Sequence, residues 1–356
     1  GIENHLRVVA RKQAERGHDV TVLVTNPAGL KTIIEEEEGV QVIRAARMTT
    51  LASTPLSLSL FNQLRQQKPD ITHLHFPYPL GEVSQYFLGK GRASILTYHS
   101  DVIKQAGILK LYDPLLRRIL QRMDRIIATS APYIQSSPYL RPLADRCTVI
   151  PLGIDVDRFA QPQTQRVAKL RTRYPGPLLL FVGRLRYYKG LNYLIESMKQ
   201  IEATLLVIGT GPEAANLGEQ AYLAGVADKI RFLGDISDEH LPVYFQAADL
   251  FVLPSSQRSE AFGIVLLEAM AAGTPVISTE LETGTSWVNQ HGETGLVVPP
   301  RDPDTLTQAV NTLLADDDQR QQMGANAKIW AKTEFGLSLL VDRLLNLYQD
   351  VLDGNV

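Results

Sequence analysis

Two glutamates spaced eight residues apart flank the start of an expected helix. Glu260 lies in a loop after an apolar run, and Glu268 lies about one turn inside a helix that begins near Gly263 and ends at Gly273. The rest of that helix is apolar, and a carboxylate there is costly to bury without a partner. Because an ionised carboxylate only accepts hydrogen bonds, it can take both hydroxyls of a vicinal diol such as ribose. The alternative, a half-exposed Glu268 beside a simple turn at Gly263, is disfavoured by the flanking apolar pattern.

The same segment offers backbone donors. The amides of Phe262, Gly263 and Ile264 lie at the helix start, where the first N–H groups have no partner within the helix. These groups and the helix dipole together favour an anion. The segment therefore predicts a phosphate site beside the carboxylates.

Two cations follow another apolar run. After Phe181-Val182, Gly183 turns the chain, and Arg184 and Lys189 precede the next expected helix. Ligands of open α/β sheets bind at the carboxyl ends of the strands. Arginine forks onto phosphate oxygens and lysine acts as a point charge, so the pair suits a diphosphate. Two solvated surface cations are an equally good interpretation of this segment alone.

A glycine turn, Gly209-Thr210-Gly211-Pro212, follows a third apolar run. It is similar to a nucleotide-binding turn, although the motif alone is weak. The turn lacks the third glycine of the dinucleotide fingerprint, which argues against a dehydrogenase.

Short apolar or β-branched runs alternate with amphipathic segments along the whole chain. This alternation predicts an α/β fold with parallel sheets that carry helices on both faces. Expected strands are 20–24, 71–75, 94–98, 125–129 and 148–151, then 178–182, 203–208, 230–233, 250–253 and 275–278. Expected helices are 3–16, 57–67, 80–88 and 108–123, then 191–201, 212–223, 239–247 and 263–272. The acidic run 35–38 is interpreted as solvated surface.

The boundary between two Rossmann-like doubly wound domains is expected near Pro151-Leu152-Gly153-Ile154. The predicted domains are 1–152 and 153–335, and residues 336–356 form an amphipathic helix. The first helix ends at Gly17, but a doubly wound domain normally opens with a strand. We therefore expect residues before Gly1 in the natural protein to supply that strand.

Composition excludes several classes of function. The net charge of −2 gives no basic field for nucleic acid. No apolar run reaches the roughly 18 residues of a membrane-spanning helix, and we find no signal-peptide pattern. Cys147 is the single cysteine and lies in an expected strand, which favours a reducing, cytoplasmic compartment and an inert thiol.

At this point the chain resembles the retaining glycosyltransferases of family 4, which have the GT-B fold. The motifs that carry the resemblance fit in order and spacing from the first residue to the last helix. They are the E-x7-E segment 260–268, Val-Gly-Arg-Leu…Lys-Gly at 182–190, Gly-Thr-Gly-Pro at 209–212, Phe-Leu-Gly at 232–234, His-Gly-Glu-Thr-Gly at 291–295 and Pro-Leu-Gly-Ile-Asp at 151–155.

The resemblance implies a role for each matched residue. Arg184 and Lys189 would hold the donor diphosphate, Glu268 the ribose, and Glu260 the donor sugar. The segment Ala261–Ile264 would bind sugar and phosphate, with Gly183 in the turn beside it. The base would lie near Gly209, Gly211 and Ile236, and Gly1 would belong to a glycine loop at the phosphates. His99 matches the family histidine that faces the donor sugar, and the last helix would pack on the first domain.

The resemblance also implies a mechanism. Retaining glycosidases need two carboxylates about 5 Å apart, and no motif in the sequence indicates such a pair. Front-face substitution is implied instead, without metal or other cofactor. Asp155-Val156-Asp157 is similar to a metal-binding D-x-D, but its place just after the domain boundary favours a linker.

The expected substrates are a nucleotide-diphosphate sugar, with UDP-glucose favoured, and a glycan or lipid-linked acceptor. Residues 104–125 mix apolar side chains with lysines and arginines. This helix either lies on an anionic membrane, at its inner face, or packs on the core with a charged outer face.

Three rival functions are compatible with parts of this pattern. A nucleotide-sugar epimerase would need no acceptor, and a non-catalytic sugar-nucleotide sensor would bind the donor without turnover. A two-lobed periplasmic-type binding protein is disfavoured by the missing signal peptide and by the Arg184/Lys189 site.

Overall fold

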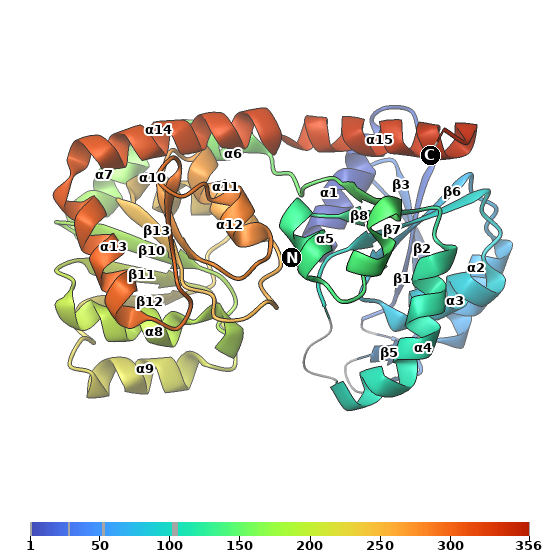
Figure 1. The fold of residues 1–356 in the computed structure, drawn as a ribbon, viewed down its shortest axis with the longest axis horizontal. Helices are drawn as coiled ribbons and strands as arrows, with labels where there is room; N and C mark the ends of the chain where they lie inside the picture. The colour runs from blue at the N-terminus through green and yellow to red at the C-terminus, as the bar shows by residue number, and fades with distance from the viewer. Residues whose placement is uncertain (1, 28, 52–53, 102–105, 356) are drawn as a thin grey trace. The chain divides into compact units, whose positions relative to one another are not determined.

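The computed structural model describes residues 2–27, 29–51, 54–101 and 106–355. The chain divides into two compact units, which are described separately here (Figure 1). Unit 1 contains Gly1–Pro151 and Ser338–Val356, and unit 2 contains Leu152–Leu337. The domain boundaries expected from the sequence were 152/153 and 335/336.

In the described part of unit 1, the principal sheet is parallel, with strand order β6-β7-β8-β9. Its strands are β6 (Ile71–Phe76), β7 (Ala93–Tyr98), β8 (Arg125–Ala128) and β9 (Cys147–Val149). A separate sheet has the order β1-β3-β2, with β1 (Val20–Thr25) parallel and β2 (Ile33–Glu37) antiparallel to β3 (Val40–Ala45). β4 (Thr49–Leu51) pairs with β5 (Thr54–Leu56). The expected strand before Gly1 concerns residues outside this chain and stays a prediction.

Strand β2 contains residues 35–37 of the acidic run 35–38, which was expected to be solvated surface. Glu35, Glu36 and Glu38 are exposed and Glu37 is partly buried, so the run does lie at the surface, as part of an edge strand paired with β3. Arg44 on β3 forms ion pairs with Glu35 and Glu37 across the ladder. Opposite charges on facing strands stabilise such a pair, and a charged edge resists pairing with another chain.

The helices of unit 1 flank these sheets. They are α1 (Ile2–Ala14), α2 (Leu58–Gln66), α3 (Pro79–Leu88), α4 (Ala106–Arg122), α5 (Ala131–Ser136) and α15 (Leu337–Asp353). α15 is joined to α1 by an ion pair between Asp342 and Arg16 and by a hydrogen bond from Gln13 to Tyr348. The last helix therefore packs on the first unit, as expected.

Unit 2 contains one parallel sheet of strand order β12-β11-β10-β13-β14-β15 in its described residues. The strands are β10 (Leu178–Val182), β11 (Thr204–Ile208), β12 (Ile230–Gly234), β13 (Leu250–Leu253), β14 (Val276–Thr279) and β15 (Gly295–Val298). β10 lies in the middle, and the chain first extends the sheet to one side and then to the other. The order thus reverses between β10 and β13, the position where doubly wound proteins bind ligands.

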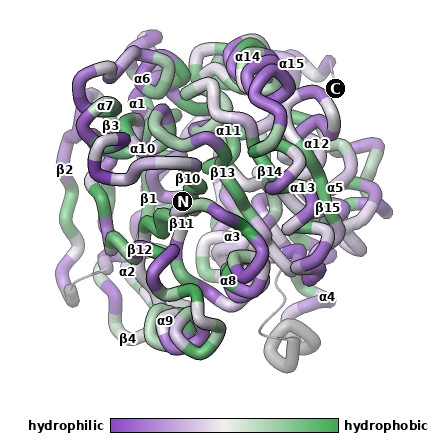
Figure 2. Tube along the Cα trace, turned by 90° about the vertical axis from the view of Figure 1, so that its left-hand side faces the viewer, coloured by the Kyte–Doolittle hydropathy of each residue, from purple (hydrophilic) through white to green (hydrophobic). Residues whose placement is uncertain are grey.

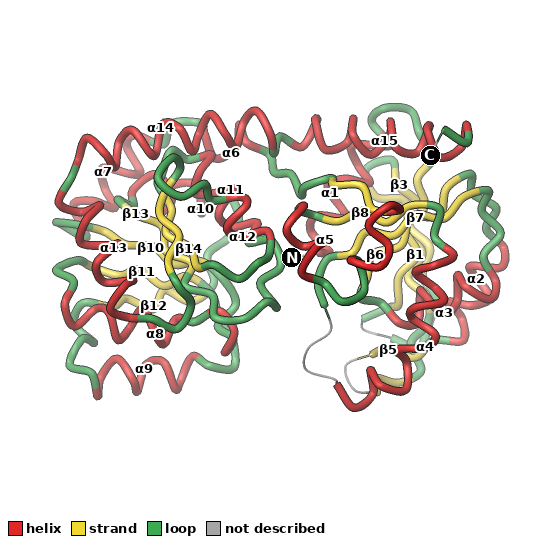
Figure 3. Tube along the Cα trace, in the orientation of Figure 1, coloured by secondary structure: helices red, strands yellow, loops and turns green. Residues whose placement is uncertain are grey.

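Helices cover both faces of this sheet. They are α6 (Val156–Ala160), α7 (Thr164–Arg173), α8 (Leu191–Ser197), α9 (Ala214–Leu223), α10 (Leu241–Ala247), α11 (Ile264–Ala271), α12 (Gly284–Val288), α13 (Pro303–Ala315) and α14 (Asp317–Glu334). Within unit 2, α8 packs against α9 and α13, whereas α10 and α11 both pack against α6 (Figure 3). Asp155 caps α6 by accepting from the Arg158 amide at 3.3 Å, so the D-x-D sequence opens a helix.

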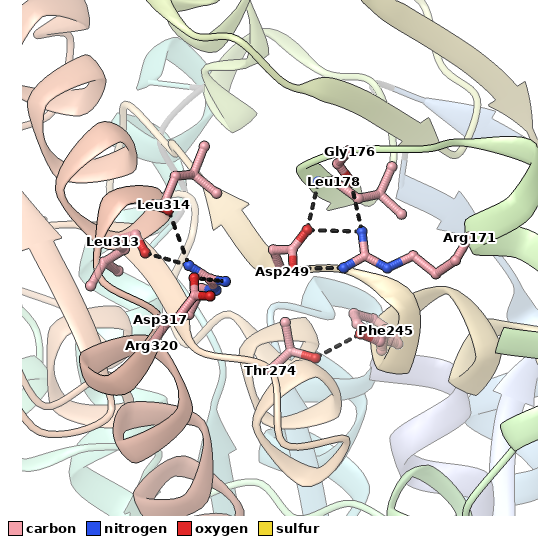
Figure 4. Close-up of polar contacts among 10 residues, drawn as sticks. All are labelled: Arg171, Gly176, Leu178, Phe245, Asp249, Thr274, Leu313, Leu314, Asp317 and Arg320. Atoms are coloured by element: carbon pink, nitrogen blue, oxygen red, sulfur yellow. Dashed lines mark hydrogen bonds and ion pairs between the residues drawn. The ribbon is translucent and has the colours of Figure 1, made fainter. Parts of the chain in front are cut away.

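The central strands of unit 2 are buried on both faces because helices cover both. Every residue of β10 and of β13 is buried, and Figure 2 shows β13 as a hydrophobic segment. At the amino ends of these strands, Arg171 donates to both carboxylate oxygens of Asp249 at 2.9 and 2.7 Å (Figure 4). Asp249 also accepts from the Leu178 amide at 2.7 Å. This contact fixes the edge of the sheet opposite the loops that carry the predicted site.

Candidate active site

The loops that follow β10 and β13 meet at the carboxyl edge of the unit 2 sheet. The Ser256 amide donates to the Tyr188 carbonyl at 2.8 Å, which ties one loop to the other. Gly190 lies against the carbonyl of Pro254 with φ +68°, and a Cβ at position 190 would lie 1.9 Å from that oxygen. Only glycine allows this approach. The two loops that carry the predicted cations and carboxylate therefore form one rigid structure.

Lys189 and Glu260 form an ion pair within this structure. The Lys189 Nζ lies 2.5 Å from Glu260 Oε2, and their side chains are only 12% and 10% exposed. The Ser255 hydroxyl donates to the same oxygen at 3.0 Å. The sequence predicted separate roles for the two residues, and the structure places them in contact. Each side chain compensates the charge of the other, and this attraction offsets part of the desolvation cost of burying them.

Glu268 lies on α11 close enough to this pair to be influenced by Lys189. Its side chain is half-buried, while most of the helix around it is fully buried. Burial raises the pKa of Glu268 to about 7, although the positive charges of Arg158 and Lys189 act in the opposite direction. The carboxyl group therefore changes its charge near neutral pH.

Helix α11 begins at Ile264, one residue later than expected, with Gly263 as its N-cap at φ +75°. The segment before α11 is held by the start of α12, because the Gly284 amide donates to the Ala261 carbonyl at 2.7 Å. Thr283 also donates to the Glu260 carbonyl at 2.9 Å. Since Gly263 has no side chain to cap the first amides, the helix start keeps the donor character that suits a phosphate.

The turns after β10, β11 and β12 pack backbone against backbone. The Gly183 amide donates to the Ile208 carbonyl at 2.9 Å, and the Gly209 amide donates to the Gly234 carbonyl at 2.8 Å. A Cβ on Gly209 would lie 2.2 Å from the Gly183 oxygen, and one on Gly211 would lie 2.3 Å from the Leu185 oxygen. The glycines predicted for base binding thus have a packing role. Ile236 packs partly buried against the unit 2 core.

Arg184 is exposed in the turn between Gly183 and Leu185. A Cβ on Gly183 would make an ordinary van der Waals contact with the Lys189 Cε, at 3.6 Å, so the turn at Gly183 lies beside the lysine side chain. Arg184, Lys189 and the start of α11 all belong to loops at one edge of the sheet. That edge supplies two cations and a helix start without a side-chain cap, groups of the kind that bind a diphosphate.

His99 follows β7 in unit 1 and is buried. Its Nε2 lies 2.9 Å from Nδ1 of His75. Burial, with a smaller contribution from the charges of His75 and His5, lowers the pKa of His99 well below its ordinary value. His99 is therefore a neutral hydrogen-bonding group at neutral pH. Gly1, the remaining predicted site residue, lies outside the described residues.

Four further side chains around His99 were not predicted from the sequence. His5, His73 and His75 are buried or half-buried near it, and Tyr348 reaches His73 from α15. The His73-Leu74-His75 pattern was a usable signal, because alternate residues of a strand share a face. The contact with Tyr348, 275 residues away, leaves no local trace in the sequence.

Two further predictions concern groups away from these loops. Cys147 is partly buried, and burial raises the pKa of its thiol to about 11, which fits the expected inert side chain. In α4, Leu116, Ile119 and Leu120 are buried, and Arg117 donates to Asp113 at 2.8 Å. The described half of the helix thus faces the core. Residues 102–105 and the side chains of 106–111 lie outside the described residues, so a membrane role and a place at the inner membrane face stay predictions.

Within the part of the chain that the structure describes, none of the helices combines the length and the apolar character that spanning a membrane requires.

Two family models together cover most of the chain. Residues 1–158 match the family described as Glycosyltransferase Family 4, and residues 163–330 match that described as Glycosyl transferases group 1. Sucrose-phosphate synthase from Thermosynechococcus elongatus has a similar structure, with a TM-score of 0.82, 26% identity and coverage of 99% of this chain and 94% of that one. The structural match confirms the expected fold class.

Relatives with similar sequences carry related names. The D-rhamnosyltransferase WbpZ of Pseudomonas aeruginosa is 42% identical over 82% of this chain and 77% of its own. The O-antigen chain mannosyltransferase C of Escherichia coli is 34% identical over 99% of this chain and 95% of its own. A GDP-mannose-dependent alpha-(1-6)-phosphatidylinositol monomannoside mannosyltransferase of Mycobacterium tuberculosis is 28% identical, with coverages of 97% and 93%.

Proposed function

Because the chain belongs to the GT-B glycosyltransferases of group 1 and family 4, we propose that it transfers a mannose-type hexose from a GDP-sugar to a hydroxyl of a glycan or lipid-linked acceptor. The observation that carries the proposal is the Lys189–Glu260 pair beside Arg184 and the start of α11. This edge of the sheet offers a diphosphate site and a sugar-binding carboxylate in one rigid structure.

The base and sugar of this proposal differ from the UDP-glucose expected from the sequence. UDP-glucose has no support among the names of these relatives, two of which are mannosyltransferases and one of which is named as GDP-mannose-dependent. The names of two relatives also support the acceptor class, since one acts on an O-antigen chain and the other on a phosphatidylinositol monomannoside.

The ion pair can serve both parts of the donor. An ammonium group has three N–H donors, so Lys189 can keep Glu260 and still donate to a phosphate oxygen. Both described contacts of the Glu260 carboxylate use Oε2, which leaves Oε1 to accept from a sugar hydroxyl. Arg184 would add a forked contact to the diphosphate. Glu268 would accept the ribose hydroxyls, and His99 would hydrogen-bond to the sugar.

The reaction we propose retains the configuration of the sugar and needs no metal. The bond between the sugar C1 and the diphosphate breaks, and the diphosphate takes the electron pair. The acceptor oxygen attacks C1 from the same face, and its proton passes to an oxygen of the departing diphosphate. Lys189, Arg184 and the amides at the start of α11 stabilise the negative charge that grows on the leaving group.

The donor is tested by thermal stabilisation with GDP, GDP-mannose, UDP and UDP-glucose, each with and without EDTA. A ligand that binds only the folded protein raises the melting temperature by mass action. We expect stabilisation by the GDP compounds, no effect of EDTA on binding or turnover, and loss of the shift in Glu268→Ala. A shift with UDP compounds alone would overturn the assignment of the base. Sugar product formed without acceptor would indicate an epimerase, and binding without turnover would indicate a sensor.

Donor binding should strengthen as pH rises through neutrality. The pKa of Glu268 is raised to about 7, and its carboxylate accepts both ribose hydroxyls only when ionised. If only the ionised form binds, the dissociation constant falls about tenfold from about pH 6 to about pH 8. Calorimetry with GDP-mannose measures this, since its diphosphate does not titrate in that range. Glu268→Gln provides the control, because it is expected to bind weakly with a flat pH profile. An equally steep profile in that variant would assign the pH dependence to another group.

A further inference from the structure

One face of β6 and β7 in unit 1 carries polar side chains. Side chains alternate between the two faces of a strand, and His75 is the register partner of Thr97. His73, His75, Thr97 and His99 therefore share one face, and we call these four residues the histidine face. The neighbouring positions Phe76, Leu96 and Tyr98, on the other face, are buried apolar and aromatic residues. Nothing in the formation of the sheet itself requires imidazoles here.

Helices α15 and α1 both contact this face. The Tyr348 hydroxyl of α15 lies 2.5 Å from Nδ1 of His73, and the Thr97 hydroxyl lies 2.7 Å from Nε2 of the same ring. Both ring nitrogens of His73 therefore have a hydrogen-bond partner. His5 of α1 approaches His99 edge-on, with 6.3 Å between ring centroids. The row is thus fixed at its His73 end and packed against α1 at its His99 end.

The three imidazoles of the face form a row. The centroids of His73 and His75 are 4.5 Å apart with an interplanar angle of 27°, so these two rings are stacked. The rings of His75 and His99 are nearly parallel, at 18°, but their centroids are 5.2 Å apart and two of their nitrogens lie within hydrogen-bonding distance, so they meet edge to edge. The ring plane of His75 is therefore set by His73 against its face and by His99 at its edge. The 2.9 Å contact joins His75 Nδ1 to His99 Nε2. Of these two nitrogens, one must donate and the other accept.

The imidazoles of the row are neutral at neutral pH. Burial, assisted by the charge of His5, lowers the pKa of His75 to about 3, and burial lowers the pKa of His5 to about 4. The pKa of His73 also lies well below its ordinary value, mainly through burial. Among the described residues, no three His, Cys, Asp or Glu side chains are placed to hold a metal ion. A metal centre therefore does not account for the row.

We propose that His75 is a positioning residue that holds the ring of His99 in place and couples the tautomer of His99 to its own, so that His99 meets the substrate through Nδ1. The contact with His75 uses Nε2 of His99, which leaves Nδ1 as the nitrogen for a sugar hydroxyl. When Nδ1 of His75 carries the proton, Nε2 of His99 accepts and Nδ1 of His99 is protonated; when it does not, the roles reverse. The inference rests on the proposed function only in that His99 contacts the donor sugar.

The direct test is the ¹⁵N spectrum of the His99 ring in the whole protein. Protonated and unprotonated ring nitrogens have well-separated shifts, so the spectrum reports the tautomer without any assay of activity. In the wild type we expect complementary rings, with the proton on Nδ1 of His75 whenever it is absent from Nε2 of His99. We expect changed His99 shifts in His75→Phe, which keeps the aromatic ring but lacks the nitrogens. His75→Asn should return the shifts towards those of the wild type, because its amide can donate to Nε2 or accept from it. His73→Phe is the matched control, because His73 has no hydrogen bond to His99. Unchanged His99 shifts in His75→Phe would overturn the proposal.

Activity separates positioning from a merely structural role. We expect His75→Phe to lower kcat about tenfold with little change in KM, as the loss of one buried hydrogen bond predicts. His75→Asn should restore most of this loss. In the His99→Ala background, His75→Phe should have no further effect, since residues that act through one group are not additive. An equal loss in both backgrounds would overturn the proposal. If His99→Ala is fully active while the tautomer still responds to His75→Phe, the positioning stands and only the assigned contact of His99 with the sugar fails.

Discussion

Replacing Lys189 with alanine is expected to lower kcat/KM for the donor by roughly 10²- to 10³-fold. The ammonium group belongs to the loop after β10 and would stabilise charge that grows on the leaving diphosphate, and removal of one preorganised donor of this kind has an effect of about that size. The substitution also leaves the Glu260 carboxylate, whose side chain is 10% exposed, without its cation. Steady-state kinetics with GDP-mannose and an acceptor glycan measure the loss.

Lys199→Ala is the matched control for this prediction. Lys199 also pairs with a glutamate, Glu196, at 2.5 Å, but both side chains are more than 40% exposed and lie on a helix surface. Such exposed pairs contribute little, so the control should keep wild-type activity. The variant Lys189→Ala/Glu260→Gln removes both charges of the buried pair, and we expect it to regain melting temperature without regaining activity. Activity within about threefold of the wild type in Lys189→Ala would exclude the proposed role of the ammonium group, since a diphosphate contact predicts a far larger loss.

The parts of the fold that depend on local composition could be predicted from the sequence. β10 and β13 are continuous apolar runs because both faces of the sheet are covered, and their positions are confirmed. β2 could not be found in this way. It is an exposed edge strand whose acidic residues are held by Arg44 on β3, so its sequence has neither an apolar run nor a clean alternation. The short β15, which begins at Gly295, was missed for a similar reason, since glycine is depleted in strands.

The features of the candidate site also divide into those that could be predicted from the sequence and those that could not. Arg184, Lys189 and Glu260 could be identified because each follows a strand, and the carboxyl ends of parallel strands meet at one edge. Their pairing could not be predicted, because it requires that β10 be the neighbour of β13, with Leu179 beside Leu250. The identity of the base could not be predicted either, since the glycine turns that were predicted to hold it pack backbone on backbone and present few side chains. The histidine face combines an alternation visible in the sequence with a tyrosine from the far end of the chain.

The two units contribute different kinds of polar group. In unit 2, cations and a carboxylate lie on loops at the edge of a sheet whose central strands, β10 and β13, are wholly apolar, where a diphosphate needs charge. In unit 1, the polar groups lie on the sheet itself and are neutral, because His75 and its neighbours are buried together. A neutral imidazole held in a fixed orientation can orient a sugar hydroxyl without attracting the anionic leaving group. We therefore expect substitutions of the unit 2 cations to affect both nucleotide affinity and turnover, and those in the histidine face to affect turnover with little change in affinity.

The loops of unit 2 should depend on the absence of a side chain at Gly190. Alanine there must adopt φ +68°, and its Cβ would lie 1.9 Å from the Pro254 oxygen and 2.9 Å from the Pro254 carbonyl carbon. The atoms in the way belong to the backbone that leads from β13 to Ser255, so they cannot rotate aside. We expect Gly190→Ala to force the loops after β10 and β13 apart. The cost is roughly 1–3 kcal/mol beyond that of the left-handed conformation, as for other overpacked positions.

Gly225→Ala isolates the steric part of this cost. Gly225 has nearly the same backbone conformation, with φ +71°, but a Cβ at position 225 would have no heavy atom of the described chain within 4 Å. Its alanine variant should therefore lose only the roughly 1 kcal/mol of a left-handed alanine. Melting temperatures compare the two variants, and donor binding below the transition reports the site. Gly190→Ala should bind GDP-mannose weakly even while folded, because its displaced loop carries Lys189 away from Glu260, whereas Gly225→Ala should bind like the wild type. Equal melting temperatures in the two variants would show that the loops after β10 and β13 can separate without loss of stability. The close contact at Gly190 would then not be what holds the Lys189–Glu260 ion pair in place.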